Sequence, residues 1–216
     1  SLKEIFFMSR AKYRLLYKDQ FVLFSPEIFV KISDGIISSY PMKGTIRADV
    51  LNAENKILED EKELAEHITI VDLIRNDLSI VAKNVTVKKF RYIDRVKTIY
   101  GDLLQVSSEI TGELPDDWRG RLGEIIFSLL PAGSITGAPK RKTVEIIKEA
   151  ESDSRGYYTG VCGYFDGVSL NSGVMIRFIE QKDGLMYYRS GGGITVYSDP
   201  VSEYNELVDK IYVAAG

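Results

Sequence analysis

The stretch Asp60–Ala82, DEKELAEHITIVDLIRNDLSIVA, predicts one long helix in a chain that is otherwise rich in strand patterns. Its apolar side chains recur at spacings of three and four residues, the period of one helical face: Leu64, Ile68, Val71, Ile74 and Leu78. Short runs with the composition and turn residues of β-strands lie on both sides of it, at 21–32, 35–45 and 85–93. The combination predicts a mixed α/β chain with neighbouring strands rather than strict βαβ alternation.

The rest of the chain continues this mixture. Helices are predicted at 118–130, which Pro131 ends, and at 138–151, with Pro139 near the first turn. Three β-rich segments separated by glycine-containing turns follow, at 157–166, 172–181 and 185–197.

A last helix is predicted from Asp199, a suitable N-cap, with Pro200 at the first helical position. Its apolar stripe consists of Tyr204, Leu207, Val208 and Ile211. Since no repeat or linker composition marks a boundary, we expect one domain over residues 1–216.

Composition excludes several classes of function. Lys and Arg number 28 against 31 Asp and Glu, a net charge of −3, so no strong cationic field favours nucleic acid as a partner. A single cysteine, Cys162, excludes an internal disulfide and a cysteine metal cage, and a single histidine, His67, leaves little for Ser-His chemistry. No apolar run reaches 18 residues, so we expect no membrane span and a cytoplasmic, reducing environment.

Two pairs of acidic residues are candidates for a metal site. Glu63 and Glu66 lie three residues apart on the long predicted helix, and Glu203 and Glu206 do so on the last one. Residues at this spacing share a helix face, and oxygen ligands of this kind suit Mg²⁺, which accepts one or two protein carboxylates and keeps several waters. The alternative is that both pairs are solvated helix surfaces.

Glycine-rich segments and isolated charges suggest an anionic ligand. In GSITGAPK, residues 133–140, small residues before a helix let backbone N–H groups approach a carboxylate, although an ordinary helix-capping loop is the alternative. Gly191–Gly193 allows a similar approach or is merely a turn. Arg177 is expected within an apolar strand, where a guanidinium needs a carboxylate partner. By themselves, Lys43 and Glu27 would be ordinary surface residues.

These segments together resemble the chorismate-utilising enzymes, the family of anthranilate, aminodeoxychorismate, isochorismate and salicylate synthases. The resemblance runs from about residue 25 to 210 through SPEIF, PMKGT, ELAEHITIVDLIRNDL, GSITGAPK, YYTGVCGY, MIRF, GGGI and SDPVSEYNELVDK. It implies an α+β, anthranilate-synthase-like chorismate-binding fold with mixed β-sheets and outer helices, whose N-terminal part is shortened here.

The resemblance also implies roles for individual residues. Glu66 and Glu203 would be direct Mg²⁺ ligands with Glu63 and Glu206 in support, and Glu27 would protonate the leaving 4-hydroxyl of chorismate. The residues implied in holding the substrate and its carboxylates are Thr45, Gly133, Ser134, Thr136, Gly137, Ala138, Tyr158, Arg177, Gly191, Gly192 and Lys210.

The branch of the family depends on Lys43. Aminodeoxychorismate synthases carry Lys in this motif, whereas anthranilate synthases usually carry Ala, so the resemblance implies that Lys43 attacks C2 of chorismate and that ammonia then enters at C4. The product would be 4-amino-4-deoxychorismate, a precursor of p-aminobenzoate and folate, with ammonia supplied by a separate glutamine amidotransferase subunit. The alternatives are anthranilate synthase component I and a non-catalytic chorismate-binding homologue. Gln105 stands where the family usually has His.

Overall fold

The computed structural model describes residues 1–96, 101–196 and 198–211. Backbone contacts divide the chain into two compact units, and each is described by itself. The smaller unit comprises Ser1–Glu27, Ser154–Cys162 and the chain from Gly173 onward, and the larger comprises Ile28–Asp153 and Gly163–Ser172.

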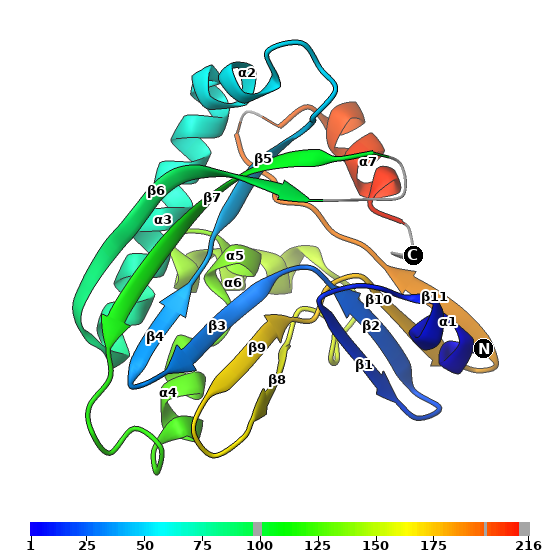
Figure 1. The fold of residues 1–216 in the computed structure, drawn as a ribbon. Helices are drawn as coiled ribbons and strands as arrows, with labels where there is room; N and C mark the ends of the chain where they lie inside the picture. The colour runs from blue at the N-terminus through cyan, green and yellow to red at the C-terminus, as the bar shows by residue number, and fades with distance from the viewer. Residues whose placement is uncertain (97–100, 197, 212–216) are drawn as a thin grey trace. The chain divides into compact units, whose positions relative to one another are not determined.

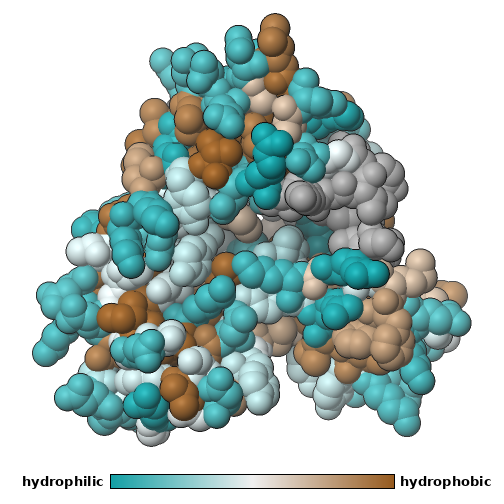
Figure 2. Space-filling model, in the orientation of Figure 1, coloured by the Kyte–Doolittle hydropathy of each residue, from teal (hydrophilic) through white to brown (hydrophobic). Residues whose placement is uncertain are grey.

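The smaller unit is built on a four-stranded antiparallel sheet in the order β1-β2-β10-β11 (Figure 1). Its elements are α1 (Leu2–Met8), β1 (Tyr13–Tyr17), β2 (Phe21–Ser25), β10 (Phe178–Lys182), β11 (Leu185–Arg189) and α7 (Pro200–Asp209). The side chains of Leu2, Val22, Phe24 and Ile179 form a buried core between α1 and the sheet. Apolar side chains also gather on the outside where α1 and β1 lie (Figure 2).

The larger unit contains most of a seven-stranded sheet in the order β5-β7-β4-β3-β9-β8, with β6 paired to β7; the first two residues of β8 and the last two of β9 are counted with the smaller unit. Its strands are β3 (Ile28–Ser33), β4 (Ile36–Ser39), β5 (Met42–Arg47), β6 (Lys83–Val96), β7 (Leu103–Glu113), β8 (Val161–Phe165) and β9 (Leu170–Val174). Its helices are α2 (Ala53–Glu59), α3 (Glu61–Val81), α4 (Leu122–Leu129), α5 (Gly133–Thr136) and α6 (Lys140–Ala150).

Helix α3 is the predicted long helix, and it packs on β5, β6 and β7 (Figure 1). The Asp60 side chain caps it by accepting a hydrogen bond from the backbone N–H of Glu63 at 2.9 Å. Its buried face differs slightly from the predicted stripe: Val71 and Leu78 are buried as expected, but Ile68 is exposed and His67 is buried instead. The His67 ring is held there by Ser108 of β7, whose Oγ lies 2.7 Å from Nε2.

The other predicted elements differ from the structure in several places; for example, only Leu185–Arg189 of the predicted β-rich segment 185–197 forms a strand among the described residues. The helix expected at 118–130 begins only at Leu122, because residues 117–121 form turns. Residues 133–136, expected as part of a loop, form the single helical turn α5. The apolar stripe of α7 is largely exposed, with Tyr204 at 66% and Val208 at 44%, while Glu203 and Leu207 are half-buried.

The expectation that Arg177 lies within a strand is wrong. Arg177 falls between β9 and β10 and has a positive φ of 54°. The apolar run that predicted one strand is divided here because β9 pairs in the seven-stranded sheet and β10 in the four-stranded sheet.

Candidate functional site

A bulge in β5 lies directly after Lys43. Lys43 pairs with Val106 of β7, and Thr45 pairs with the preceding residue, Gln105, so Gly44 is an extra residue in the strand. Because side chains alternate along β7, Lys43 lies on the face of Val106 and Thr45 on the opposite face. Gly44 has a φ of +76°, and a Cβ there would lie 3.2 Å from Oε2 of Glu63, so this position favours glycine.

Lys43 contacts the acidic pair of α3. Its Nζ lies 3.1 Å from Oε2 of Glu66, and both side chains are partly buried, at 41% and 28% exposed. Burial, followed by the nearby charge of Glu66, raises the pKa of Glu63. The structure therefore brings together three predicted site residues, one cation and two carboxylates, on adjacent elements of the larger unit.

Thr45 makes a separate contact on the other face of β5. The side-chain amide of Gln105 donates a hydrogen bond to Thr45 Oγ1 at 3.2 Å. A cavity of about 210 Å³ lies against this part of the strand, the second half of α2 and the start of α3. Its lining includes two predicted site residues and consists of Gly44, Thr45, Ile46, Lys56, Ile57, Asp60 and Glu63.

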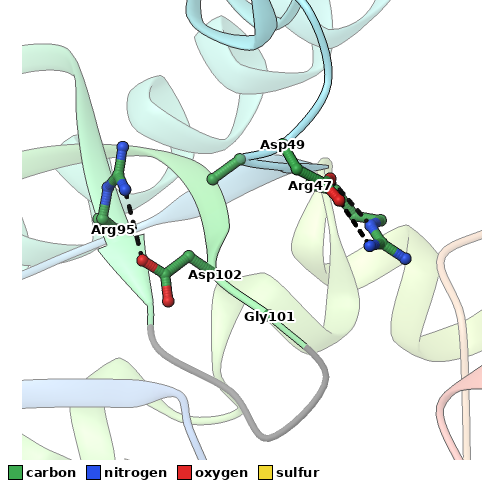
Figure 3. A pocket seen from close by; sticks show the side chains of 6 residues that line it. Arg47, Asp49, Arg95, Gly101 and Asp102 are labelled. Atoms are coloured by element: carbon green, nitrogen blue, oxygen red, sulfur yellow. Dashed lines mark hydrogen bonds and ion pairs between the residues drawn. The ribbon is translucent and has the colours of Figure 1, made fainter.

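A second cavity, of about 250 Å³, contains none of the predicted site residues. It lies at the end of β5 and is lined by Arg47, Ala48, Asp49, Arg95, Gly101 and Asp102 (Figure 3). Both arginines already contact carboxylates: Arg47 donates two hydrogen bonds to Asp49, at 3.0 and 2.7 Å, and Arg95 donates one to Asp102 at 3.3 Å. These ion pairs make the cavity a poor candidate for an anionic ligand.

The segment 133–140 has a buried base and an exposed rim. Gly133 and Thr136 are buried, whereas Ser134 and Ala138 are exposed, and Gly137 is intermediate. A Cβ on Gly133 would lie 3.0 Å from Oδ2 of Asp77, so this glycine allows the segment to pack directly on α3. The arrangement leaves the rim accessible to a ligand.

In the smaller unit, the glycine-rich segment packs on Tyr158 and α7. A Cβ on Gly191 would lie 2.9 Å from the Tyr158 hydroxyl, and one on Gly192 would lie 3.7 Å from Oε2 of Glu203. Four predicted site residues of this unit are therefore neighbours in two pairs, and the contact between Gly191 and Tyr158 is possible only because position 191 is a glycine.

Helix α7 is held against β11 by hydrogen bonds to its last carbonyl groups. The hydroxyl of Tyr188 donates to the carbonyl of Lys210 at 2.9 Å, and that of Ser190 to the carbonyl of Leu207 at 3.0 Å. The Lys210 ammonium pairs with Glu206 at 2.6 Å. These contacts fix the helix that carries two of the predicted metal ligands.

Ser198 is a neighbour of Glu203 that sequence reasoning missed. Its Oγ donates to Oε1 of Glu203 at 2.6 Å and accepts from the backbone N–H of Thr195 at 3.0 Å. The serine precedes the N-cap Asp199, and nothing in a helix-capping pattern indicates that this hydroxyl contacts a carboxylate one turn into the helix.

Glu27 and Arg177 are both fixed through their backbones. The carbonyl of Glu27 accepts from the N–H of Val174 at 3.1 Å, and the carbonyl of Arg177 accepts from the N–H of Phe24 at 3.1 Å. Glu27 therefore lies just after the end of β2, and Arg177 lies beside β2.

The carboxylate pairs supply oxygen ligands, the type that a hard divalent cation prefers. Among the described residues, no three side chains of His, Cys, Asp or Glu converge as a ready-made metal cage. Mg²⁺ does not need one, because it retains several waters beside one or two carboxylates. Glu63 and Glu66, partly buried in the larger unit, and Glu203, oriented by Ser198 in the smaller one, suit such a cation.

The chain belongs to the chorismate-binding enzyme family, whose model matches residues 7–216. It is 57% identical over 213 residues to an uncharacterized PabA-like protein of Haemophilus influenzae, covering 99% of this chain and 65% of that protein. It is also 36% identical over 201 residues to aminodeoxychorismate synthase component 1 of Bacillus subtilis, covering 89% of this chain and 42% of that one.

The fold agrees with this family. Anthranilate synthase component I from Streptococcus pneumoniae superposes with a TM-score of 0.82 at 27% identity, covering 97% of this chain and 47% of that structure. The predicted family and fold class are thereby confirmed. The chain spans about two thirds of the length of the Haemophilus relative and less of the others. Within the described residues, no helix is both long and apolar enough to cross a membrane.

Proposed function

We propose that this chain is the chorismate-converting part of an aminodeoxychorismate synthase component I, forming 4-amino-4-deoxychorismate from chorismate and ammonia. The observation that carries the proposal is Lys43, whose amine lies 3.1 Å from Oε2 of Glu66 on α3. A lysine in this motif is the feature by which the sequence resembles aminodeoxychorismate synthases rather than anthranilate synthases.

In the proposed reaction, Lys43 is the nucleophile and Glu27 the acid. The neutral amine forms a bond to C2 of chorismate, the ring double bonds shift, and the C4–O bond breaks. Glu27 gives its proton to the departing oxygen, so that water leaves. Ammonia then forms a bond to C4, the double bonds shift back, and the C2–N bond to Lys43 breaks.

The remaining predicted residues would bind the two carboxylates of chorismate. Arg177 and Lys210 would supply positive charges to these carboxylates. Backbone N–H groups would come from Gly191, Gly192 and the rim of the 133–138 segment, where small residues let a ligand approach the backbone. Thr45, whose hydroxyl accepts a hydrogen bond from Gln105, is also proposed to contact the substrate.

The proposed cofactor is Mg²⁺, with Glu66 and Glu203 as ligands and Glu63 and Glu206 in support. When bound, the ion would supply Lewis-acid stabilisation of a substrate carboxylate and of charge that develops as the hydroxyl departs. The ion would also compete with Lys43 for Glu66, which favours release of the amine for attack.

The ammonia is proposed to come from a separate glutamine amidotransferase subunit. Glutamine hydrolysis by an amidotransferase would need a reactive nucleophile, but burial raises the pKa of the Cys162 thiol and so disfavours the thiolate. The only histidine, His67, is buried against Ser108.

Anthranilate synthase component I is the second candidate. The chain is 40% identical over 195 residues to anthranilate synthase component 1 of Acetivibrio thermocellus, covering 86% of this chain and 38% of that protein. In that reaction ammonia would enter at C2 and pyruvate would be eliminated.

Incubation with chorismate, Mg²⁺ and ammonium, followed by chromatography, separates the two candidates by product. Mass spectrometry of the protein with chorismate and Mg²⁺ but without ammonia should show an adduct on Lys43. The Lys43→Ala variant should lose both the adduct and aminodeoxychorismate formation, whereas Lys62→Ala, an exposed lysine on α3, should retain both. If Lys43→Ala still makes aminodeoxychorismate at the full rate and the wild type forms no adduct, Lys43 is not the nucleophile.

A further inference from the structure

A buried ion pair joins helix α3 to the end of the segment 130–139. Nζ of Lys140, the first residue of α6, donates to Oδ2 of Asp77 on α3 at 2.8 Å. The Lys140 and Asp77 side chains are only 21% and 12% exposed. Lysine and aspartate side chains are usually exposed to solvent in proteins, so this degree of burial is unusual. Removing one partner of such a pair leaves an uncompensated charge inside the protein.

The same ammonium also binds the beginning of the segment. Lys140 Nζ donates a second hydrogen bond, at 3.1 Å, to the carbonyl of Leu129, the last residue of α4. That carbonyl lies in the last turn of a helix, where no intrahelical N–H is available to it. One amine therefore closes the segment 130–139 at both ends and attaches it to α3.

The aspartate in turn supports the floor of the segment. Gly133 packs so closely on Asp77 that an added Cβ would lie 3.0 Å from the carboxylate and 3.1 Å from Cδ2 of Leu73. Ala132 and Thr136 are buried on the same side, and α5 contacts α3 (Figure 1). The exposed rim of the segment is thus held at a fixed distance from the helix that carries Glu63 and Glu66.

We propose that Asp77 and Lys140 are positioning residues that hold the 130–139 segment in the conformation that binds a substrate carboxylate. This role rests on the proposed function, because it assumes that the rim of the segment contacts chorismate. The pair acts through the segment and does not itself touch the substrate. Burial raises the pKa of Asp77 while Lys140 opposes the shift, as expected for a carboxylate whose charge depends on one partner.

Two variants separate positioning from stability. Lys140→Met leaves Asp77 buried without its cation, and this variant can fail to fold. The double variant Asp77→Asn/Lys140→Met removes both charges at nearly constant side-chain volume and should fold. Asp72→Asn is the matched control, because it breaks an exposed ion pair with Arg75 on the same helix.

Amide hydrogen exchange of the full chain measures the segment without any substrate. In the double variant we expect peptides from 130–139 to exchange about tenfold faster or more, whereas peptides from the first half of α3 keep the wild-type rate. Chorismate binding in the presence of Mg²⁺, measured by calorimetry, should weaken about tenfold, the equivalent of one lost charge-assisted hydrogen bond. Asp72→Asn should match the wild type in both measurements.

Wild-type exchange over 130–139 in the folded double variant would overturn the proposal, as would faster exchange with unchanged chorismate affinity. A uniform acceleration along α3 and the segment would also overturn it, because the pair would then act only on overall stability. Failure of the wild-type chain to bind chorismate would reject the proposed function, and it is detected before any variant is made.

Discussion

Substituting Ser108 by alanine tests how α3 is fixed to the sheet below it. Ser108 is fully buried in β7 and its Oγ has two partners: Nε2 of His67 at 2.7 Å and the backbone N–H of Arg91, which donates at 3.0 Å. Alanine removes both contacts without adding bulk. Solvent does not reach this position in the folded chain, since Ser108 and His67 are 0% and 1% exposed.

The cost follows from the two groups left behind. A buried polar group that loses its partner costs about 1–3 kcal/mol, so two groups at about 1.5 kcal/mol each give a loss of about 3 kcal/mol in the free energy of unfolding. For a chain of this size, about 2–4 °C of melting temperature corresponds to each kcal/mol, so we expect a decrease of about 6–12 °C.

Urea unfolding followed by circular dichroism measures this loss as a lower midpoint at constant slope. Ser79→Ala is the control, because the Ser79 hydroxyl lies on the surface of α3 and donates to the carbonyl of Arg75. Its unfolding free energy should change by less than about 0.5 kcal/mol. A loss in Ser108→Ala no larger than that of Ser79→Ala would refute the described hydrogen bonding between α3 and β7.

Three further predictions concern the site and its pH dependence. Glu66→Gln should abolish Mg²⁺-dependent chorismate turnover while leaving the circular dichroism spectrum unchanged. Turnover at the wild-type level would show that Glu66 is not a ligand of the metal. Arg177→Lys keeps the charge but loses the two-pronged donor, so calorimetry should show chorismate binding about tenfold weaker, and an unchanged dissociation constant would count against a substrate role. Burial, assisted by the charges of Arg91 and Lys43, lowers the pKa of His67 to about 4 from 6.5. The folded state therefore resists protonation, and stability that is complete above pH 6.5 should fall by about 3 kcal/mol as the pH drops toward 4. Urea midpoints across this range should show a shallower fall for His67→Gln, and parallel curves would contradict the assignment.

Features that depend on residues near each other in the chain could be predicted from sequence. The long helix begins where Asp60 caps it, and the last begins at Asp199 with Pro200 in its first turn, because caps and periodicity act over a few residues. The collinear motifs likewise indicated the family, which the comparisons confirm.

Features that depend on distant partners could not be predicted. The apolar run around Arg177 gave no sign that the chain changes from one sheet to another there, since strand pairing is decided by residues elsewhere. The partner of Lys140 is 63 residues away along the chain, and no local pattern distinguishes Asp77 from the other acidic residues of α3. The contact between Ser198 and Glu203 was missed for another reason: it is local, but a capping pattern does not include it.

The bulge at Gly44 adds one residue to β5 without changing the pairing on either side of it. Lys43 pairs with Val106 and Thr45 with Gln105, so the residues that flank Gly44 alternate as they would in a regular strand. Deleting Gly44 would therefore keep Thr45, Ile46 and Arg47 on the faces they now occupy, and would remove only the local bend and twist that a bulge gives a strand. A substitution at the same position acts differently, because the new side chain would have a φ of +76° and would lie 3.2 Å from Oε2 of Glu63. This position should therefore tolerate loss of the residue better than its replacement by a larger one.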